Sequence, residues 1–489
     1  MSTIGNNIFG DKMKKIIIIG GGITGLCCGI FLLKKGYNVS IYEKNEFAGG
    51  CCSGWYKDGF YIDNCMHWLT GTNQLTKTFK LWKKVGAIDE TSNLYQGDYF
   101  YKSILNDEAI EFSKDIEVLR QNMLQLSYSD KKEIDRFINT VKRFITINKS
   151  NSIYTNLILK PVSYYNSYKY YRHLSLEDLG NRFKHPLLRK MFTDFLPKEY
   201  CSLALIYAYA TFASGNGKVY SKGSMSFANN ILNTFISLGG FIHYKSEVTG
   251  INIINNNIES ITINDHQVIF GDEFIYTASI GNLFNKLLDN SYMHEVLKEK
   301  LENKDVNPIY SSFHVAFKIK KKVNEFKDSM IFEIPPVKVG NTNINRLMVK
   351  DYSYLYDDKN EIVFQVFIVQ NENDYKYWTE LKENNEELYD KEKEKVSLKL
   401  QEIILDKYPK LKESIKILDC WTPVTYYDYF YLHMGSYMGF TFTKQSNIKH
   451  IPNKLKGINN FHLYTFWQKI SGGLPVSLSL GIECSKNVK

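Results

Sequence analysis

The stretch Lys15-Ile16-Ile17-Ile18-Ile19-Gly20-Gly21-Gly22-Ile23-Thr24-Gly25 decides the fold of this chain. Its first five residues are mostly β-branched, which is typical of a parallel strand buried on both faces. Directly afterwards, Gly20, Gly22 and Gly25 satisfy the G-x-G-x-x-G pattern of a dinucleotide-binding turn. The first glycine allows a tight turn, the second lets the backbone approach a pyrophosphate, and the third lets helix and strand pack closely. The stretch therefore predicts a strand, a phosphate-binding turn and the start of a helix.

The residues after the turn complete a nucleotide-binding unit. Residues 26–35 are predicted to form a helix that ends at Gly36, and residues 38–42 are predicted to form a second strand. The amino end of a helix presents free N–H groups and the positive end of the helix dipole. Ile23 and Thr24 are therefore candidate cofactor contacts.

A carboxylate completes the pattern. Glu43 lies 23 residues after Gly20, at the spacing of the acid that binds the adenosine ribose. Its negative charge would repel a 2′-phosphate, which argues against NADP. A glycine motif alone also occurs as a tight turn in other α/β proteins, but here strand, turn, helix, strand and acid follow in order.

Two alternative interpretations of the same region are a membrane-spanning helix and a signal peptide. Residues 16–33 are 18 uncharged residues, the minimum length of a spanning helix, and lysines precede them as in a signal peptide. Four glycines fall within the first ten of these residues, and no small-x-small cleavage pattern follows. We expect a buried strand, turn and helix, and no membrane span.

Composition excludes several classes of function. The 489 residues include 61 Lys plus Arg and 52 Asp plus Glu, a net charge of +9 that is mild for this length. Only seven of the 61 basic residues are Arg, and no nucleic-acid-binding module is present, so we expect no nucleic-acid partner. The eight Cys show no Cys-x-x-Cys and no zinc spacing. We therefore expect no metal site, reduced thiols and a cytoplasmic protein.

The residues after the second strand carry a resemblance to a known family. Glu43-Lys44 is followed shortly by Gly49-Gly50 and then by Gly59-Phe60-Tyr61-Ile62-Asp63. This run resembles the flavin fingerprint of the phytoene desaturase and amine oxidase superfamily, which includes retinol saturase, carotenoid isomerase and the monoamine oxidases. The resemblance implies FAD as cofactor, held in part by Glu43, Lys44, Gly49 and Gly50. One departure is Cys51, where these proteins usually carry Arg.

A second block fits the same superfamily. Lys222-Gly223-Ser224-Met225 leads into a predicted helix over residues 226–238. Short strands are predicted after it, at residues 241–244, 248–254, 258–263 and 268–270. The resemblance implies that Val248 contacts the adenine through its backbone.

A third block lies near the carboxyl end. Ser471-Gly472-Gly473-Leu474-Pro475 precedes a predicted helix over residues 476–488, and the superfamily ends similarly. The resemblance implies that Gly473, Leu474 and Pro475 pack against the flavin, where free N–H groups stabilise negative charge on the reduced ring. Amine oxidases with a covalent flavin place Cys just before the glycine pair. This chain has Lys469-Ile470-Ser471 there, so we expect non-covalent FAD.

These blocks predict the domain organisation. The fold class is α/β: a Rossmann-like FAD-binding domain assembled from residues 14–100, 220–300 and 440–489, with an inserted mixed α+β substrate domain. The inserts are residues 101–219 and 301–439. Within them we predict helices at residues 176–179, 183–195 and 379–407 and a strand at residues 363–369.

The reacting residues are the least determined by the sequence. A flavin carries the redox chemistry itself, and no Ser/His/Asp or metal pattern is found. His67, in a stretch that resembles the loop beside the flavin ring, is the catalytic candidate; it either donates a proton or only shapes the cavity. Tyrosine-rich runs at residues 164–171 and 426–431 either line a channel for a long apolar substrate or serve ordinary packing.

The favoured function is an FAD-dependent oxidoreductase that desaturates, saturates or isomerises carbon–carbon bonds of a hydrophobic, polyene or isoprenoid substrate. The alternatives are a flavin amine oxidase and a non-catalytic lipid-binding protein of the Rab GDP-dissociation inhibitor type. The apolar segment 203–212 would either contact a membrane or form an interior helix that lines the cavity, and we favour the interior helix. We therefore expect at most reversible, peripheral membrane contact.

Overall fold

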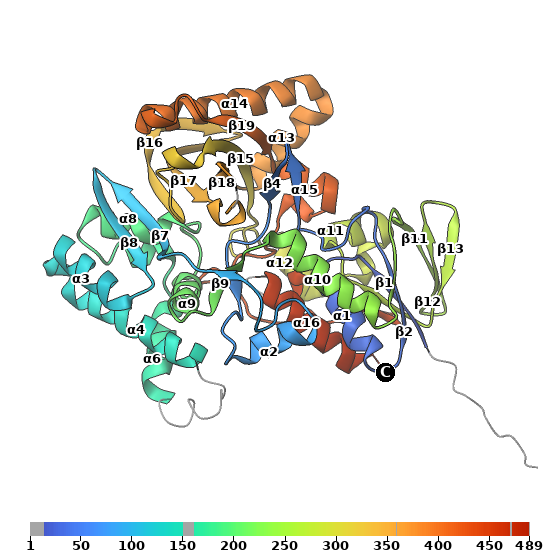
Figure 1. The fold of residues 1–489 in the computed structure, drawn as a ribbon. Helices are drawn as coiled ribbons and strands as arrows, with labels where there is room; N and C mark the ends of the chain where they lie inside the picture. Colours follow the sequence, from blue (N-terminus) through green and yellow to red (C-terminus); the bar gives the residue numbers. More distant parts are fainter. Residues whose placement is uncertain (1–13, 150–160, 358, 470–471, 489) are drawn as a thin grey trace, which may run out of the picture.

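A five-stranded parallel sheet forms the centre of one half of the molecule. The computed structural model describes residues 14–149, 161–357, 359–469 and 472–488 (Figure 1). The strands come from the beginning, middle and end of the chain. In spatial order they are β10 (Phe241–His243), β2 (Asn38–Tyr42), β1 (Lys15–Ile19), β14 (Glu273–Tyr276) and β20 (Phe461–Leu463).

Strand β1 is covered on both faces, as its apolar run predicts. Ile16 and Ile18 pack into a core with three helices, and Ile17 and Ile19 pack into a core with a small antiparallel sheet. The helices are α1 (Ile23–Leu33), α10 (Gly223–Ser237) and α16 (Leu474–Asn487), which lie together beside β1 in Figure 1. The antiparallel strands are β11 (Val248–Ile254), β12 (Asn257–Ile263) and β13 (Gln267–Phe270).

Several helices differ by a few residues from their predicted ranges, and three of the differences have a clear local cause. The first begins at Ile23 rather than at residue 26, because the N–H of Leu26 already donates to the carbonyl of Gly22 inside the glycine turn. The helix predicted for residues 183–195 begins at Pro186, which occupies its first turn. The charged segment 379–407 belongs to two helices, because Asn385 ends one and its side chain caps the amino end of the next.

A seven-stranded mixed sheet forms the other half. Its spatial order is β19 (Lys416–Trp421), β15 (Ser311–Lys320), β18 (Glu361–Gln370), β17 (Thr342–Asp351), β16 (Ser329–Val339), β7 (Tyr99–Leu105) and β8 (Glu108–Ser113). All neighbours pair antiparallel except β16 and β7. Helices α13 (Glu372–Asn384) and α14 (Glu386–Lys407) pack against this sheet, with Trp378 in its core (Figure 1).

Helices from the first insert pack beside this sheet (Figure 1). They are α3 (Ile116–Leu126), α4 (Lys131–Lys149), α6 (Pro161–Arg172), α7 (Leu176–Gly180), α8 (Pro186–Asp194) and α9 (Ser202–Ala213). Most of α9 is buried, which confirms the interior helix predicted for residues 203–212. Among the described residues, no helix is long and apolar enough to cross a membrane.

A β-hairpin joins the two halves. It consists of β3 (Gly54–Lys57) and β4 (Phe60–Asp63), and Figure 1 shows it beside the seven-stranded sheet. Phe60 and Ile62 are buried in the core of that sheet, and Gln365 of β18 donates to the carbonyl of Asp63 at 2.8 Å. The Asp63 carboxylate accepts from the N–H of Ser224 at 2.6 Å and from its hydroxyl at 2.8 Å, at the start of α10.

Candidate active site

A cavity of about 590 Å³ opens at the carboxyl ends of β1, β2 and β14. Strands β2 and β14 flank β1 on opposite sides, so the order of the sheet reverses at this point. Ligands of open α/β sheets bind in the crevice at such a switch point. Every residue predicted to bind the cofactor lines this cavity except Gly25.

The glycine turn has the shape that a pyrophosphate requires. Gly20 has a φ of +103°, which other residues rarely adopt. A Cβ on Gly22 would meet only the Cα of Gly50, at 3.9 Å, so this backbone faces open space in the cavity. A Cβ on Gly25 would lie 2.1 Å from the carbonyl oxygen of Gly20, which explains why Gly25 packs the helix and does not line the cavity. The turn thus fits the phosphates of a dinucleotide.

Glu43 presents a buried carboxylate at the end of β2. Its Oε2 accepts from the N–H of Gly21 at 2.7 Å, and its Oε1 accepts from the N–H of Asn45 at 2.9 Å. Burial raises the pKa of Glu43, although these two hydrogen bonds act in the opposite direction. Each carboxylate oxygen retains a second acceptor site for a ribose hydroxyl. The geometry therefore fits the adenosine part of FAD.

Lys44 and Val248 line the cavity beside Glu43. The Lys44 ammonium lies 3.4 Å from the ring centre of Tyr431, and the Tyr431 hydroxyl donates to Glu247 at 2.9 Å. Burial lowers the pKa of Lys44. Residues 428–431 are thereby held across this end of the cavity.

The amino end of α16 faces the cavity from the opposite side. Gly472, Gly473, Leu474 and Pro475 line it, whereas Ser471 lies outside the described residues. Gly473 has a φ of +83° and caps the helix, and Pro475 occupies the first turn. Free N–H groups of this helix end can face a bound flavin.

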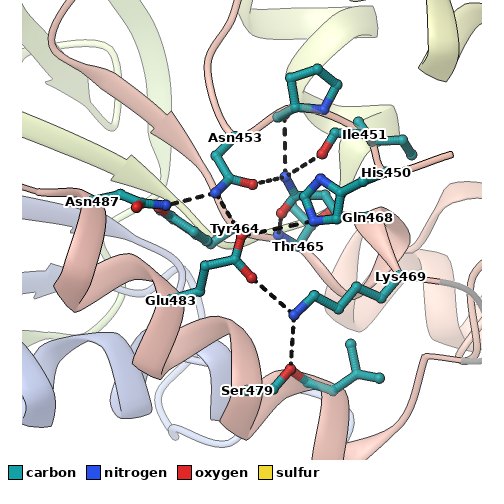
Figure 2. A network of polar contacts seen from close by, with 12 residues as sticks. His450, Ile451, Asn453, Tyr464, Thr465, Gln468, Lys469, Ser479, Glu483 and Asn487 are labelled. Atoms are coloured by element: carbon teal, nitrogen blue, oxygen red, sulfur yellow. Dashed lines mark hydrogen bonds and ion pairs between the residues drawn. The ribbon is translucent and has the colours of Figure 1, made fainter.

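A polar network that the sequence did not predict anchors α16 (Figure 2). Glu483 accepts from Asn453 at 2.9 Å and forms an ion pair with Lys469 at 2.9 Å. Asn453 also donates to the hydroxyl of Tyr464 at 3.3 Å, and Lys469 donates to Ser479 at 3.1 Å. The network ties the segment before Gly472 to the helix after it, and so positions the glycine turn.

The far side of the cavity is apolar and aromatic. Its wall comes from the loop after β4, from α9, from the seven-stranded sheet and from the segment after it: Met66, Trp68, Leu196, Tyr200, Ala204, Tyr207, Ala208, His314, Phe367, Tyr426, Tyr437, Met438 and Phe466. Of the two predicted tyrosine-rich runs, the second contributes Tyr426, Phe430 and Tyr431. None of the first run's described side chains reaches the cavity.

His67 and His314 lie in this wall. His67 packs edge-on against Phe367, and burial together with the charge of Lys350 lowers its pKa well below the ordinary value. His314 stacks on Trp421, and its Nε2 lies 2.7 Å from the Ser312 hydroxyl and 3.3 Å from that of Tyr426. Burial lowers the pKa of His314 to about 3. Both imidazoles are therefore neutral at physiological pH.

His314 and Lys350 were not predicted from the sequence. His314 interrupts the apolar middle of β15, Lys350 directly follows the apolar run Leu347-Met348-Val349 of β17, and both side chains are buried. That interruption of an apolar run was the available signal.

The charges of the cavity wall are unevenly distributed. Among the described lining residues the carboxylates are Glu43 and Glu247, and both lie at the end of the cavity formed by β2 and β11. On the aromatic side, none of the lining residues that the structure describes is a carboxylate. It offers an apolar surface with two neutral histidines.

Comparisons with known proteins identify the family. Residues 23–448 match the family of flavin containing amine oxidoreductases. The 4,4'-diaponeurosporene oxygenase of Staphylococcus aureus (strain bovine RF122 / ET3-1) is 24% identical over 289 residues, which cover 56% of this chain and 58% of that relative. The match thus spans less than two thirds of the relative's length.

Solved structures show the same fold. An oxidoreductase from Methanosarcina mazei has a TM-score of 0.57 at 14% identity, over 95% of this chain and 98% of its own. Putrescine oxidase bound to putrescine has a TM-score of 0.60 at 12% identity, over 97% of this chain and 99% of its own. With the family match over most of its length, and a cavity whose glycine turn fits a dinucleotide, the chain belongs to the flavin-containing amine oxidoreductase family.

Proposed function

We propose that this enzyme desaturates, saturates or isomerises carbon–carbon bonds of a hydrophobic substrate of the polyene or isoprenoid type. The observation that carries the proposal is the aromatic side of the cavity, which has no carboxylate among its described residues. An apolar chain gains about 25 cal/mol per Å² when it is buried against such a wall. A charged amine would lose its hydration there without an ionic partner. The relatives named as oxygenases of 4,4'-diaponeurosporene support the same substrate class.

We assign the cofactor contacts as follows, with FAD held non-covalently. Glu43 binds the ribose and Val248 the adenine, with Lys44 beside them. The pyrophosphate lies on the glycine turn of Gly20, Gly22, Gly49 and Gly50 and on the amino end of α1, at Ile23 and Thr24. Gly473, Leu474 and Pro475 face the flavin ring. FAD, when bound, supplies the two-electron redox chemistry.

The chain's own residues then hold the substrate. The parallel-sheet half (residues 14–100, 220–300 and 440–489) carries the cofactor, and residues 101–219 and 301–439 supply most of the apolar wall. Helix α9 and the aromatic side chains of β18 and α15 (Pro423–Phe430) orient the apolar chain and exclude water. His67 is the residue in this wall best placed to exchange a proton with the substrate.

The amine oxidase alternative is supported by the family match and by the fold shared with putrescine oxidase. Among the described residues, the aromatic side has no carboxylate to pair with a cationic substrate, which speaks against this alternative. The non-catalytic lipid-binding alternative has no support, because the chain belongs to an enzyme family and retains the glycine turn and Glu43.

The test is substrate-dependent reduction of the bound flavin without oxygen. The FAD-loaded enzyme is mixed with a polyene in detergent micelles or with putrescine, and the flavin absorbance and the products are followed. We expect bleaching or polyene conversion with the apolar substrate alone. Reduction by putrescine with an unchanged polyene would overturn the proposal.

A matched pair of variants on α9 localises the substrate. Ala204 lines the cavity and Ala213 does not, and both are half-buried. Ala204→Asp should abolish polyene turnover, because it places a carboxylate in the apolar wall, while Ala213→Asp retains turnover. Equal effects of the two substitutions would count against this location of the substrate.

A further inference from the structure

A second, smaller cavity of about 50 Å³ lies behind the wall that contains His67. His67 and Trp68 line both cavities, so they form part of the partition between them. The polar side chains of the small cavity include Asp328, Lys350 and Asp351. Its volume and polarity suffice for a few water molecules.

Lys350 is a buried cation in this partition. It lies on β17, is 6% exposed, and its Nζ has three hydrogen-bond partners, all uncharged. Two are the carbonyl oxygens of Met66 and His67, each at 3.2 Å, and the third is Nδ1 of His67 at 3.4 Å. An ammonium group only donates, so Nδ1 accepts and the His67 proton resides on Nε2.

Burial lowers the pKa of both Lys350 and His67, and nearby charged groups modify the two values. Burial lowers the pKa of Lys350 to about 8, and the carboxylates of Asp63 and Asp328 and the thiol of Cys65 act in the opposite direction. Burial, then Lys350 and then His314, lower the pKa of His67. His67 is therefore a neutral imidazole beside a cation that can release its proton near neutral pH.

We propose that Lys350 and His67 form a proton relay between the small cavity and the substrate. The inference rests on the proposed carbon–carbon chemistry. In saturation the Nε2–H bond of His67 breaks as its proton passes to one substrate carbon, Nδ1 takes a proton from the Lys350 ammonium, and the other carbon takes the hydride that reduced FAD would supply. A proton from solvent, passed through the water of the small cavity, then reprotonates the Lys350 amine, and proton exchange with water returns the ring to its Nε2–H tautomer. Desaturation is the reverse: the substrate gives a proton to Nε2 of an Nδ1-protonated ring, Nδ1–H passes its proton to the neutral Lys350 amine, and the hydride passes to oxidised FAD.

His67 is the catalytic residue in this relay, and Lys350 is a positioning residue that acts through it. No carboxylate on the aromatic side of the cavity, among the described residues, competes for this role. Asp351, which lines the small cavity, has its pKa raised to about 6 by burial and can exchange protons with the water there.

The pairing can be tested without turnover, by ¹⁵N NMR of histidine rings in the FAD-loaded protein, with His67→Gln to assign the signal. We expect an Nε2-protonated ring in the wild type and in Lys350→Arg. In Lys350→Met the pKa of His67 should rise, because a neighbouring positive charge is removed. The control is Lys318→Met on β15, which is separated from β17 by β18 and where Nζ lies 3.4 Å from Glu361. An Nδ1-protonated ring in the wild type, or the same titration in Lys350→Met, would overturn the pairing.

Turnover tests the relay itself. General acid–base groups contribute about 10²–10⁴-fold, so His67→Gln should lower kcat by that range. Lys350→Met should lower kcat with little change in KM and abolish the limb of the pH profile near about 8, and Lys350→Arg should restore part of kcat. Variants with normal FAD content and an unchanged pH profile would refute the relay. A wild-type enzyme that converts no polyene would instead refute the proposed function, while the NMR result stands separately.

Discussion

Glu43 connects the glycine turn to the end of β2 through two backbone hydrogen bonds. Since a hydrogen bond to a charged group is worth about 1.5–3 kcal/mol, we expect Glu43→Ala to weaken FAD binding by that amount. The measurement is the dissociation constant of FAD by flavin fluorescence. Glu46→Ala is the control, because that exposed carboxylate only pairs with Lys245 at the surface. Equal retention by Glu43→Ala and the wild type would show that the ribose site is misassigned.

His314 gives a prediction for pH dependence. Its pKa is about 3 in the folded protein and about 6.5 when unfolded. Between these values the unfolded state binds more protons, so acidification costs about 1.4 kcal/mol of stability per pH unit. The difference in free energy of unfolding between wild type and His314→Gln should therefore decrease by about 1.4 kcal/mol for each pH unit as the pH is lowered from about 6 to about 4.

Urea denaturation across this pH range measures the slope. The exposed His266 supplies the control variant His266→Gln, which should titrate in parallel with the wild type. A difference between wild type and His314→Gln that does not vary with pH would contradict the buried, neutral state of His314.

Among single site residues, the sequence predicted those whose position is set by a local motif. It missed those whose position depends on the pairing of distant strands. Gly20, Gly22 and Glu43 lie within one strand–turn–helix–strand unit, where spacing alone sets geometry. His314 and Lys350 reach the site only through the register of β15 and β17 in a distant sheet. One sequence does not reveal that register.

The contact between β1 and α1 depends on Gly25. A Cβ there would lie 2.1 Å from a backbone carbonyl, so Gly25→Ala forces helix and turn apart, at a cost of about 1–3 kcal/mol or more. We expect a lower melting temperature and a large loss of FAD affinity. Gly36→Ala is the matched variant at the other end of the helix, where the φ is +89° and nothing lies within 4 Å. It should lower stability through backbone strain alone and keep FAD affinity, so equal FAD affinity in both variants would refute the role of Gly25.

Secondary structure was predicted well where short-range signals are strong. The strands at residues 15–19, 38–42 and 248–254 have the predicted bounds. The boundary at Asn385 was missed because the charged segment around it continues a helical pattern, and only the cap shows where one helix ends. Strands β14 and β20 were not predicted; family resemblance implied only that the domain is assembled from three segments of the chain, and local pattern does not specify how strands from these segments pair.

For the whole molecule we predict at most reversible membrane contact, and we expect an apolar substrate to enter the cavity near α9. Tyr207 lines the cavity and is 46% exposed, so it marks an opening of the cavity. With a net charge of +9, the FAD-loaded protein should co-sediment with anionic liposomes at low salt and dissociate at high salt. Binding that survives high salt would show that apolar insertion dominates instead.

The entry route has its own test. Tyr207→Asp should slow turnover of a polyene embedded in liposomes, because it places a charge at the opening. Tyr128→Asp, at a tyrosine that is 71% exposed and does not line the cavity, should not. Equal rates for the two variants would refute entry at Tyr207.

The hairpin of β3 and β4 makes the two halves respond to each other. Its apolar residues are buried in the seven-stranded sheet, while Asp63 holds the first turn of α10 in the cofactor-binding half. Neither half can loosen without exposing Phe60 and Ile62 or releasing this buried carboxylate. We therefore expect cofactor binding to slow amide hydrogen exchange in β18 as well as in the cofactor-binding half, and the protein to unfold as one cooperative unit.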